Sequence, residues 1–367
     1  MLSEDDLALI HALQLRPRAS WSVLGAALGV DPVTVARRWT RLAQRGEAWI
    51  LGSPGPLLFE HICVAFVEIE CAVGSAAAVA RALSGQAHAL TIERPAGSHD
   101  LLVTVATRDL LAMSRYTLDQ LPAIAGVTAV RTRIATHLFT EGGSWRIAAL
   151  DPGQRAQLTA SPEQPRARRG SPEISPFDRA ILRRLAVDGR ASYQALATAL
   201  ETSAATVKRR IDRLGHLGLI TFRCDFARPL GGWPVAATFW ARVPPTDLPE
   251  VGHALVRYPE TRNCAAVSGP YNLVLEASLH SLADVLRFET QLATMHPSLD
   301  IVDRAIMLRQ DKLLGHLLDP HGRSLGVVPA DLWSAPGTPV PEHRRTMDPF
   351  TADPAAGREQ VQPDIPG

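Results

Sequence analysis

The chain has few of the residues that mark disulfide-rich, metal-binding or strongly charged proteins. Its 367 residues include four cysteines (Cys63, Cys71, Cys224 and Cys264), and none of them belongs to a Cys-x-x-Cys pair. This spacing disfavours a disulfide framework or a zinc site and predicts buried free thiols. The formal net charge is only +1, so any contact with nucleic acid must come from local clusters of Lys and Arg.

Patterns for membrane insertion, metal binding and catalysis are missing as well. No apolar run reaches the length of a membrane span and no signal peptide opens the chain, so we expect a cytoplasmic protein without membrane contact. His61, His88 and His137 are scattered without metal-ligand spacing, and no nucleophile–base set or Gly-rich phosphate loop occurs. We therefore expect no cofactor, no metal and no catalytic residue.

What is present is a stretch, residues 178–220, with the pattern of three short helices. Its apolar residues recur at steps of three and four, as in Val207, Ile211 and Leu214 of the third helix. The second and third helices are separated by a tight turn, and Ser203 is placed to cap the third. Two helices joined in this way, the second rich in Lys and Arg, are typical of a helix-turn-helix.

The third helix carries its basic residues on the face opposite its apolar stripe, where a helix in the major groove needs them. Arg38 and Arg210 lie nearer the core, where we expect them to brace their units against Asp6 and Asp178. The alternative is an ordinary solvated basic face. The residues from which we predict DNA contacts are Thr34, Arg37 and Arg41 in the first half of the chain, and Thr206, Lys208, Arg209 and Arg213 in the second.

The chain repeats itself at an offset of 172 residues. This offset places Asp6 on Asp178, and Arg18-Ala19-Ser20 on Arg190-Ala191-Ser192. A unit of roughly 140 residues has therefore been duplicated whole, and internal repetition governs the architecture. The first helix-turn-helix has drifted further from the pattern than the second, because Arg16-Pro17 stands where the second has Asp188-Gly189.

A region of alternating strand and helix patterns follows each helix-turn-helix, in the order βαββαβ. That order predicts a ferredoxin-like domain, an antiparallel sheet with helices on one face. The predicted fold class is α+β, with two winged helix-turn-helix domains (1–52 and 174–225) alternating with two ferredoxin-like domains (60–140 and 233–316). We expect a linker at 141–173, in which Trp145 and Ile147 pack locally, and a disordered tail at 319–367, of which Val327, Val328 and Trp333 could dock onto the folded domains.

These features resemble the Lrp/AsnC family, the leucine-responsive and asparagine-regulatory transcription factors of bacteria and archaea. The resemblance covers roughly residues 2–140 and 174–315. It implies a sequence-specific regulator that binds double-stranded DNA and whose sheet domains assemble protomers. The residues that carry it are Asp178, Gly189-Arg190-Ala191-Ser192, Leu196-Ala197, Arg209-Arg210 and Gly218-Leu219-Ile220.

The resemblance also implies an amino-acid effector, or a related small metabolite, beside a Gly-x-x-Asp loop between the second and third strands of each sheet. Asn272 cannot form the ion pair that Asp100 could, and His99 replaces the aromatic residue that the family tends to show. The alternative is a plain hairpin turn, for which Gly and Asp or Asn are the usual residues. The predicted effector residues are Gly97, Ser98 and Asp100 in the first loop, and Gly269, Tyr271 and Asn272 in the second.

Two other functions stay open. A ligand-free architectural DNA-binding protein would need the same helix-turn-helix units. Siroheme decarboxylases resemble the same two-domain architecture, but they carry an Asn-His-Asn-Tyr-x-Arg-Glu run where this chain has ALTIERP and RNCAAVS.

The duplication also predicts how the chain assembles. Because one chain holds two sheet domains, we predict an intrachain pseudo-dimer with the two sheets paired, and a higher homo-oligomer built through their outer faces. Pairing of each half with its twin in a second chain is the alternative.

Overall fold

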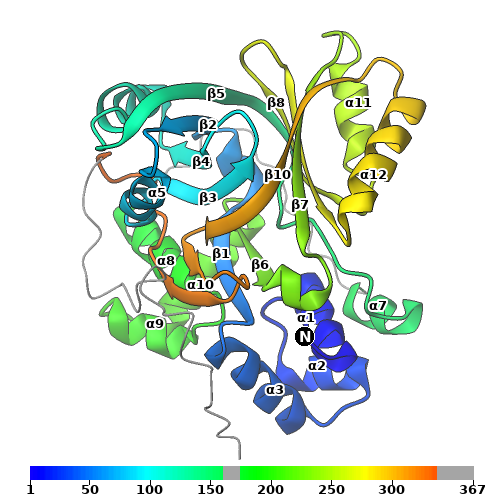
Figure 1. The fold of residues 1–367 in the computed structure, drawn as a ribbon. Helices are drawn as coiled ribbons and strands as arrows, with labels where there is room; N and C mark the ends of the chain where they lie inside the picture. The colour runs from blue at the N-terminus through cyan, green and yellow to red at the C-terminus, as the bar shows by residue number, and fades with distance from the viewer. Residues whose placement is uncertain (160–173, 337–367) are drawn as a thin grey trace, which may run out of the picture.

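The computed structural model describes residues 1–159 and 174–336, and both halves contain a helix-turn-helix, a wing strand and a sheet unit (Figure 1). The first half consists of α1 (Glu4–Leu15), α2 (Trp21–Leu28), α3 (Pro32–Gln44), β1 (Ala48–Pro54), α4 (Pro56–Phe59), β2 (Cys63–Cys71), α5 (Ala76–Ser84), β3 (Ala89–Ala96), β4 (Leu101–Thr107), α6 (Leu110–Ser114), η1 (Arg115–Gln120), β5 (Val127–Thr140) and α7 (Pro152–Thr159). The second half consists of α8 (Pro176–Val187), α9 (Tyr193–Ala199), α10 (Ala204–His216), β6 (Ile220–Phe226), η2 (Arg228–Gly231), β7 (Val235–Arg242), α11 (Leu248–Leu255), β8 (Thr261–Val267), β9 (Leu273–Leu279), α12 (Leu282–Met295), β10 (Asp300–Leu313), β11 (His316–Leu318) and β12 (Ser324–Val327).

The helices of the two DNA-binding units begin at equivalent capping residues. In each case a side-chain oxygen just before the helix accepts a backbone N–H of the first turn, which satisfies a donor that has no partner inside the helix. The caps of the first unit are Ser3, Ser20 and Asp31, and those of the second, at an offset of 172, are Ser175, Ser192 and Ser203.

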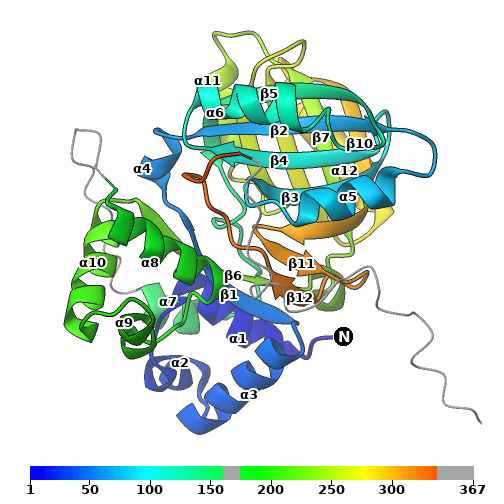
Figure 2. The ribbon, with the colours of Figure 1, turned by 90° about the vertical axis from the view of Figure 1, so that its left-hand side faces the viewer.

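Eight strands of the two sheet units form one closed barrel in the order β3-β4-β2-β5-β8-β9-β7-β10, because β10 pairs with both β7 and β3 (Figure 2). The two junctions between the halves are symmetric. Ala135 of β5 pairs with Val267 of β8, and their repeat equivalents Met307 and Pro95 pair in the same way. The two sheets therefore pair within one chain, which is the intrachain arrangement that the duplication predicts.

The barrel has helices outside and aromatic side chains within. Helices α5 and α6 cover the outer face of the first sheet, and α11 and α12 cover that of the second (Figure 1). Inside, Phe66 and Trp240 lie edge to face with ring centroids 6.4 Å apart. Closure of the barrel leaves fewer open strand edges.

A two-stranded ribbon connects the DNA-binding units to the barrel (Figure 2). Strands β1 and β6, the wings of the two units, pair antiparallel with Leu51 opposite Arg223 at the centre. These two residues are 172 positions apart, so the pseudo-two-fold axis that relates the two halves passes through this pair.

Residues 141–159, predicted to be linker, instead complete the core of the first helix-turn-helix. Trp145, Ile147 and Leu158 are buried against α1 and its neighbours. The polar side chains of α1 hold this segment, since His11 Nδ1 accepts the N–H of Leu150 at 3.1 Å and Gln14 Oε1 accepts the N–H of Ile147 at 3.0 Å. The Pro, Gly and Ser content led to the linker prediction, but Trp145, Ile147 and Leu158 cover an otherwise open helix face. Residues 160–173 of the predicted linker lie outside the described residues.

The prediction of a disordered tail is wrong for residues 319–336. Strand β12 pairs with β11, Val328 is buried, and Trp333 packs against the core of the second helix-turn-helix. The segment lacks the helical or strand periodicity that sequence reasoning detects, because it is held by partners far away in the chain. Residues 337–367 lie outside the described residues.

Within residues 1–159 and 174–336, every helix is too short or too polar to cross a lipid bilayer.

Candidate nucleic-acid interface

The third helix of each DNA-binding unit, α3 or α10, buries one face and exposes the other. Val207 and Leu214 of α10 are in the core, whereas Arg209 is exposed. The equivalent Arg37 of α3 is exposed too. Neither guanidinium has an ion-pair partner within the described part of the chain, so both are free to reach phosphates or guanine edges.

Arg41 and Arg213, also predicted to contact DNA, are turned toward carboxylates. Arg41 forms an ion pair with the buried Asp6, and Arg213 lies 3.6 Å from the buried Asp178. A helical wheel places these arginines outside, but it does not account for the length of the side chain, which lets the guanidinium fold back onto the first helix of its unit. Their role in this structure is to tie the third helix to the first.

Arg38 and Arg210 brace their units in the same manner. Arg38 donates to Asp5 at 2.8 Å, and Arg210 lies 3.7 Å from Asp178. Asp178 also accepts the N–H of Ser175 and so completes the capping box of α8. One buried carboxylate thus organises both the start of the first helix and the position of the third.

The remaining predicted DNA contacts are differently placed. Lys208 is exposed and donates to Asp212 at 2.6 Å, one turn along α10. Thr206 is half-buried and lies 2.9 Å from the capping hydroxyl of Ser203. Thr34 is half-buried near the start of α3.

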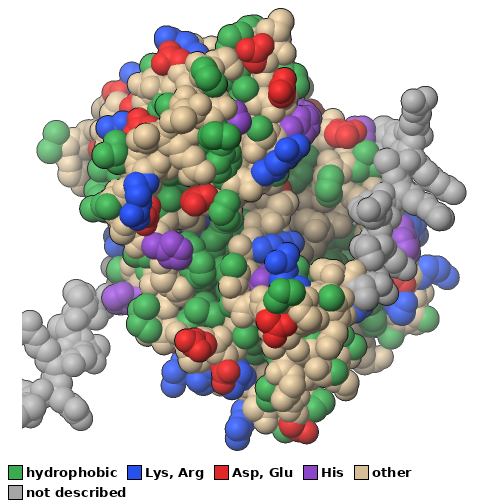
Figure 3. All heavy atoms as spheres, turned by 90° about the vertical axis from the view of Figure 1, so that its right-hand side faces the viewer, with side chains coloured by type: hydrophobic (Ala, Val, Ile, Leu, Met, Phe, Trp, Pro, Cys, Tyr) green, Lys and Arg blue, Asp and Glu red, His purple; other side chains and the backbone are tan. Residues whose placement is uncertain are grey.

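The two units are joined by a reciprocal pair of arginines. Arg190 donates to the carbonyls of Pro17 and Ala19 at 2.7 and 2.9 Å. Its repeat equivalent Arg18 donates to the carbonyls of Gly189 and Ala191. Because each arginine holds the turn of the other unit, α3 and α10 are fixed as a pseudo-two-fold pair, on the side of the molecule away from the barrel (Figure 2). Figure 3 shows the face opposite to that of Figure 2, and at its lower edge a few Lys and Arg side chains lie beside Asp and Glu side chains.

Two sequence families match the parts of the chain just described. The AsnC-type helix-turn-helix domain matches residues 2–43 and 174–214, and the Lrp/AsnC ligand binding domain matches residues 64–144. The chain belongs to the Lrp/AsnC family.

The curated relatives are described as HTH-type transcriptional regulators. An uncharacterized HTH-type transcriptional regulator of Pyrococcus horikoshii is 28% identical over 117 residues, which are 32% of this chain and 74% of the relative. A similarly described protein of Pyrococcus abyssi is 27% identical over 117 residues, again 32% of this chain and 74% of the relative. Each alignment therefore has about the length of one repeat of this Lrp/AsnC protein.

One solved structure resembles both halves together. The siroheme decarboxylase NirDL is 13% identical, with a TM-score of 0.55 over 85% of this chain and 93% of that chain. At this identity the similarity concerns the fold alone.

The two loops that the Lrp/AsnC resemblance marks for an effector use their polar side chains to hold strands. Asp100 accepts the N–H of Cys71 at 2.7 Å. Asn272 accepts the N–H of Val243 at 2.9 Å and donates to its carbonyl at 2.7 Å. Cys71 and Val243 are repeat equivalents, so both loops clamp the end of the first strand of their sheet. Asp100 is exposed and Asn272 half-buried.

The other loop residues surround this clamp. Gly97 and Ser98 are exposed, and the hydroxyl of Ser98 lies 3.4 Å from Nδ1 of the buried His99. Gly269 has a φ of +112°, which favours glycine, and its Cα faces the guanidinium of Arg133. Tyr271 lies over the same guanidinium at 4.8 Å.

Arg133 closes this end of the barrel. It makes a two-pronged ion pair with Glu68, at 2.8 and 3.1 Å, and its guanidinium lies against the rings of both Trp240 and Tyr271, at 5.1 and 4.8 Å. This buried pair was missed in the sequence, because a single Glu and a single Arg in two amphipathic strands do not reveal that the strands are neighbours.

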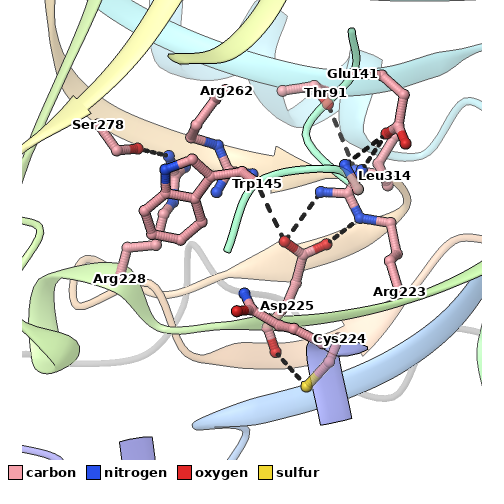
Figure 4. Close-up of polar contacts among 12 residues, drawn as sticks. Thr91, Glu141, Trp145, Arg223, Cys224, Asp225, Arg228, Arg262, Ser278 and Leu314 are labelled. Carbon is pink, nitrogen blue, oxygen red and sulfur yellow. Dashed lines mark hydrogen bonds and ion pairs between the residues drawn. The ribbon is translucent and has the colours of Figure 1, made fainter. Parts of the chain in front are cut away.

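At the opposite end of the barrel, a buried ionic network links it to the ribbon (Figure 4). Arg223 of β6 donates to Asp225 at 2.7 and 3.0 Å and to Glu141 at 2.7 Å, while Arg262 of β8 lies 3.6 Å from Asp225. Burial opposes ionisation of Asp225, but the neighbouring guanidiniums outweigh it and hold the pKa of that carboxyl below its usual range. The sequence offers one signal for this network, which is the alternation of charged and apolar residues in β6.

Proposed function

We propose that this protein is a sequence-specific, DNA-binding regulator of transcription in which one chain supplies both recognition helices. The observation that carries the proposal is the pseudo-two-fold pair α3 and α10, held by the reciprocal Arg18 and Arg190 contacts with Arg37 and Arg209 exposed. A simpler relative would need two chains to present two such helices. The operator is expected to be an imperfect palindrome, since the two helices differ in sequence.

The test begins with selection of bound fragments from genomic DNA by the full chain, followed by fluorescence anisotropy on the enriched site. Arg209→Ala should weaken binding by about 1–3 kcal/mol if Arg209 contacts a base edge. Arg37→Ala should weaken it less, since the first unit has drifted. Arg257→Ala, an exposed arginine beyond α11, is the matched control and should change nothing.

Two results would contradict this reading. Failure to enrich any sequence over random fragments would remove sequence specificity. Equal affinity of wild type, Arg37→Ala and Arg209→Ala would remove α3 and α10 as the DNA-contacting helices.

We also propose that an amino acid or related small metabolite adjusts DNA binding. The matched Lrp/AsnC ligand binding domain supports an effector of some kind. Asp100 and Asn272 already hold backbone groups, so replacing Asp100 with Ala should loosen the end of β2 more than it changes effector affinity. Calorimetry on Asp100→Ala with a panel of amino acids separates the two effects.

A tetrapyrrole enzyme is the second candidate, because the fold resembles that of NirDL, a structure also known with an iron-uroporphyrin III analogue. The discriminating observation is the ultraviolet–visible spectrum after incubation with an iron-loaded uroporphyrin. A regulator should leave the spectrum of the free pigment unchanged, whereas a shifted Soret band that co-elutes with the chain would favour the enzyme.

A further inference from the structure

A cavity of about 100 Å3 lies inside the barrel at the end that faces the ribbon. Its floor includes Ser53 and Pro54 of β1 and Arg223 of β6, and its walls come from strands of both halves. A buried water needs on the order of 10–15 Å3 of such space, so a molecule of roughly six to eight non-hydrogen atoms fits. A second cavity, of about 210 Å3, shares Glu93, Arg228 and Gln310 with the first and extends to the exposed Leu308, which offers an entry path.

The two halves of the chain line this cavity with different chemistry. Positions related by the repeat face each other across the pseudo-two-fold axis, and the second half mostly supplies the more polar member. The second half supplies the more polar member in the pairs Leu90 and Arg262, Leu138 and Gln310, Phe66 and Thr238, Thr104 and Glu276, and Thr91 and Asn263, whereas the first half supplies it in the pair Glu141 and Leu313. A homodimer would have to repeat one wall twice. Duplication within one chain allows an apolar wall and a charged wall, and therefore one asymmetric site per chain.

The charged wall, which also includes Glu93 of the first half, holds groups of both signs that are incompletely paired. Arg228 donates to the neutral oxygens of Ser278 and Gln310, at 3.1 and 2.6 Å, and lies near Glu93 without a close ion pair among the described residues. Glu93 accepts one hydrogen bond, from the amide of Gln310 at 2.8 Å. Two further polar atoms, Oγ of Ser53 and Oδ1 of Asn263, are buried without a partner in the described residues, and Ser53 is only 6% exposed.

We propose that this cavity is a binding site for a small zwitterion, a molecule with an ammonium and a carboxylate on a short aliphatic chain. Arg228 and Arg262 would hold the carboxylate, Glu93 and Glu276 would hold the ammonium, and the aliphatic chain would lie against the wall formed by Phe66, Leu90 and Leu138. A site between the barrel and the ribbon is distinct from the Gly-x-x-Asp loops, which lie beside the Arg133 end of the barrel.

The surroundings of Glu276 support the ammonium position. Glu276 faces Glu93 of β3, Arg262 and Asn263 of β8, and Arg228 of η2. Burial, and then the charge of Glu93, raise the pKa of Glu276 to about 8. At neutral pH the Glu276 carboxyl is therefore mostly protonated, and an ammonium beside it would take the place of that proton.

The same contacts give the ligand a route to the DNA-binding units, a step that rests on the proposed function. Arg262 lies 3.6 Å from Asp225, which is part of the ribbon strand β6. A ligand carboxylate competes with Asp225 for Arg262, so that occupation of the cavity loosens the tie between barrel and ribbon. DNA affinity should then change on ligand binding.

The test uses three probes on the full chain: L-2-aminobutyrate, propylamine, which lacks its carboxylate, and butyrate, which lacks its ammonium. Isothermal titration calorimetry should give one site per chain for 2-aminobutyrate, and at least tenfold weaker binding for the other two. Glu276→Gln and Arg228→Gln should each lower the affinity tenfold or more. Glu250→Gln and Arg257→Gln, both on the exposed surface, are the matched controls and should keep it.

A measurement on the unsubstituted chain guards against misfolded variants. Hydrogen exchange should slow in 261–267 and 273–279 on addition of 2-aminobutyrate, while the loop 97–100 stays unchanged. Slowing confined to 97–100, equal binding of all three probes, or absence of binding would overturn the site. Binding of 2-aminobutyrate by a chain that selects no DNA would keep the site and overturn its coupling to DNA.

Discussion

Substitution of Arg190 tests how the two DNA-binding units are held in a fixed relative position. Its guanidinium donates two hydrogen bonds to the other unit, at 2.7 and 2.9 Å, and lies 3.9 Å over the ring of Trp21. Hydrogen bonds from a charged donor contribute about 1.5–3 kcal/mol each, and a half-exposed cation–π contact about 0.5–1 kcal/mol. Burial, and then the like charge of Arg18, lower the pKa of Arg190 to about 10, so part of that gain is offset. We therefore expect Arg190→Ala to lower the free energy of unfolding by about 2 kcal/mol.

Chemical denaturation followed by circular dichroism measures this loss, with the exposed Arg184→Ala as control. Arg190→Lys should not rescue stability, because an ammonium cannot span two carbonyls as a guanidinium does. Operator affinity should fall as well, since α3 and α10 lose their fixed spacing. In the double variant Arg18→Ala/Arg190→Ala, the second substitution should cost more than the first, because the first already removes the repulsion between the two like charges. Arg190→Ala with wild-type stability and wild-type DNA affinity would refute the interface as a structural element.

Three further predictions concern stability. Asp178→Ala removes a buried carboxylate that completes a capping box and pairs with Arg210 and Arg213. Thermal unfolding should show that the free energy of unfolding falls by about 2–4 kcal/mol, against at most about 0.5 kcal/mol for the exposed Asp5→Ala. Equal losses for the two variants would contradict this prediction. Trp145→Ala should cost about 3–5 kcal/mol and destabilise the first helix-turn-helix, and a change below about 1 kcal/mol would show that residues 141–159 do not complete its core. Burial lowers the pKa of His11 to about 4 and that of His316 to about 3, so both contribute stability that grows as pH rises toward 6.5. Burial raises the pKa of Glu276 from 4.5 to about 8, so its contribution falls as pH rises through that range, and stability should peak near pH 6.5 and then decline by on the order of 1 kcal/mol. Glu276→Gln should abolish the decline, and an unchanged profile would rule out this assignment.

The sequence by itself determined the three helices of each DNA-binding unit and the order of strands and helices in each sheet unit. Regular apolar spacing gave the helices of each DNA-binding unit, and alternation with β-branched residues gave the βαββαβ order. A capping residue such as Ser203 is a local signal, and the offset of 172 is found by comparing the sequence with itself. Both can be read from a single sequence. For the same reason the exposed positions of Arg37 and Arg209 could be read from helical periodicity.

Only the tertiary structure decided which residues meet across the repeat. The turn of Arg41 and Arg213 toward Asp6 and Asp178, and the packing of Trp145 and Trp333, depend on long side chains and on partners distant in the chain. The charged cavity depends on the tertiary structure even more strongly, because its walls come from two different sheets. Glu93 and Glu276 belong to strands 183 residues apart, in sheets that could have paired within a chain or between chains. Strand alternation tells which side chains share a face of one sheet, but it carries no information on which second face they oppose.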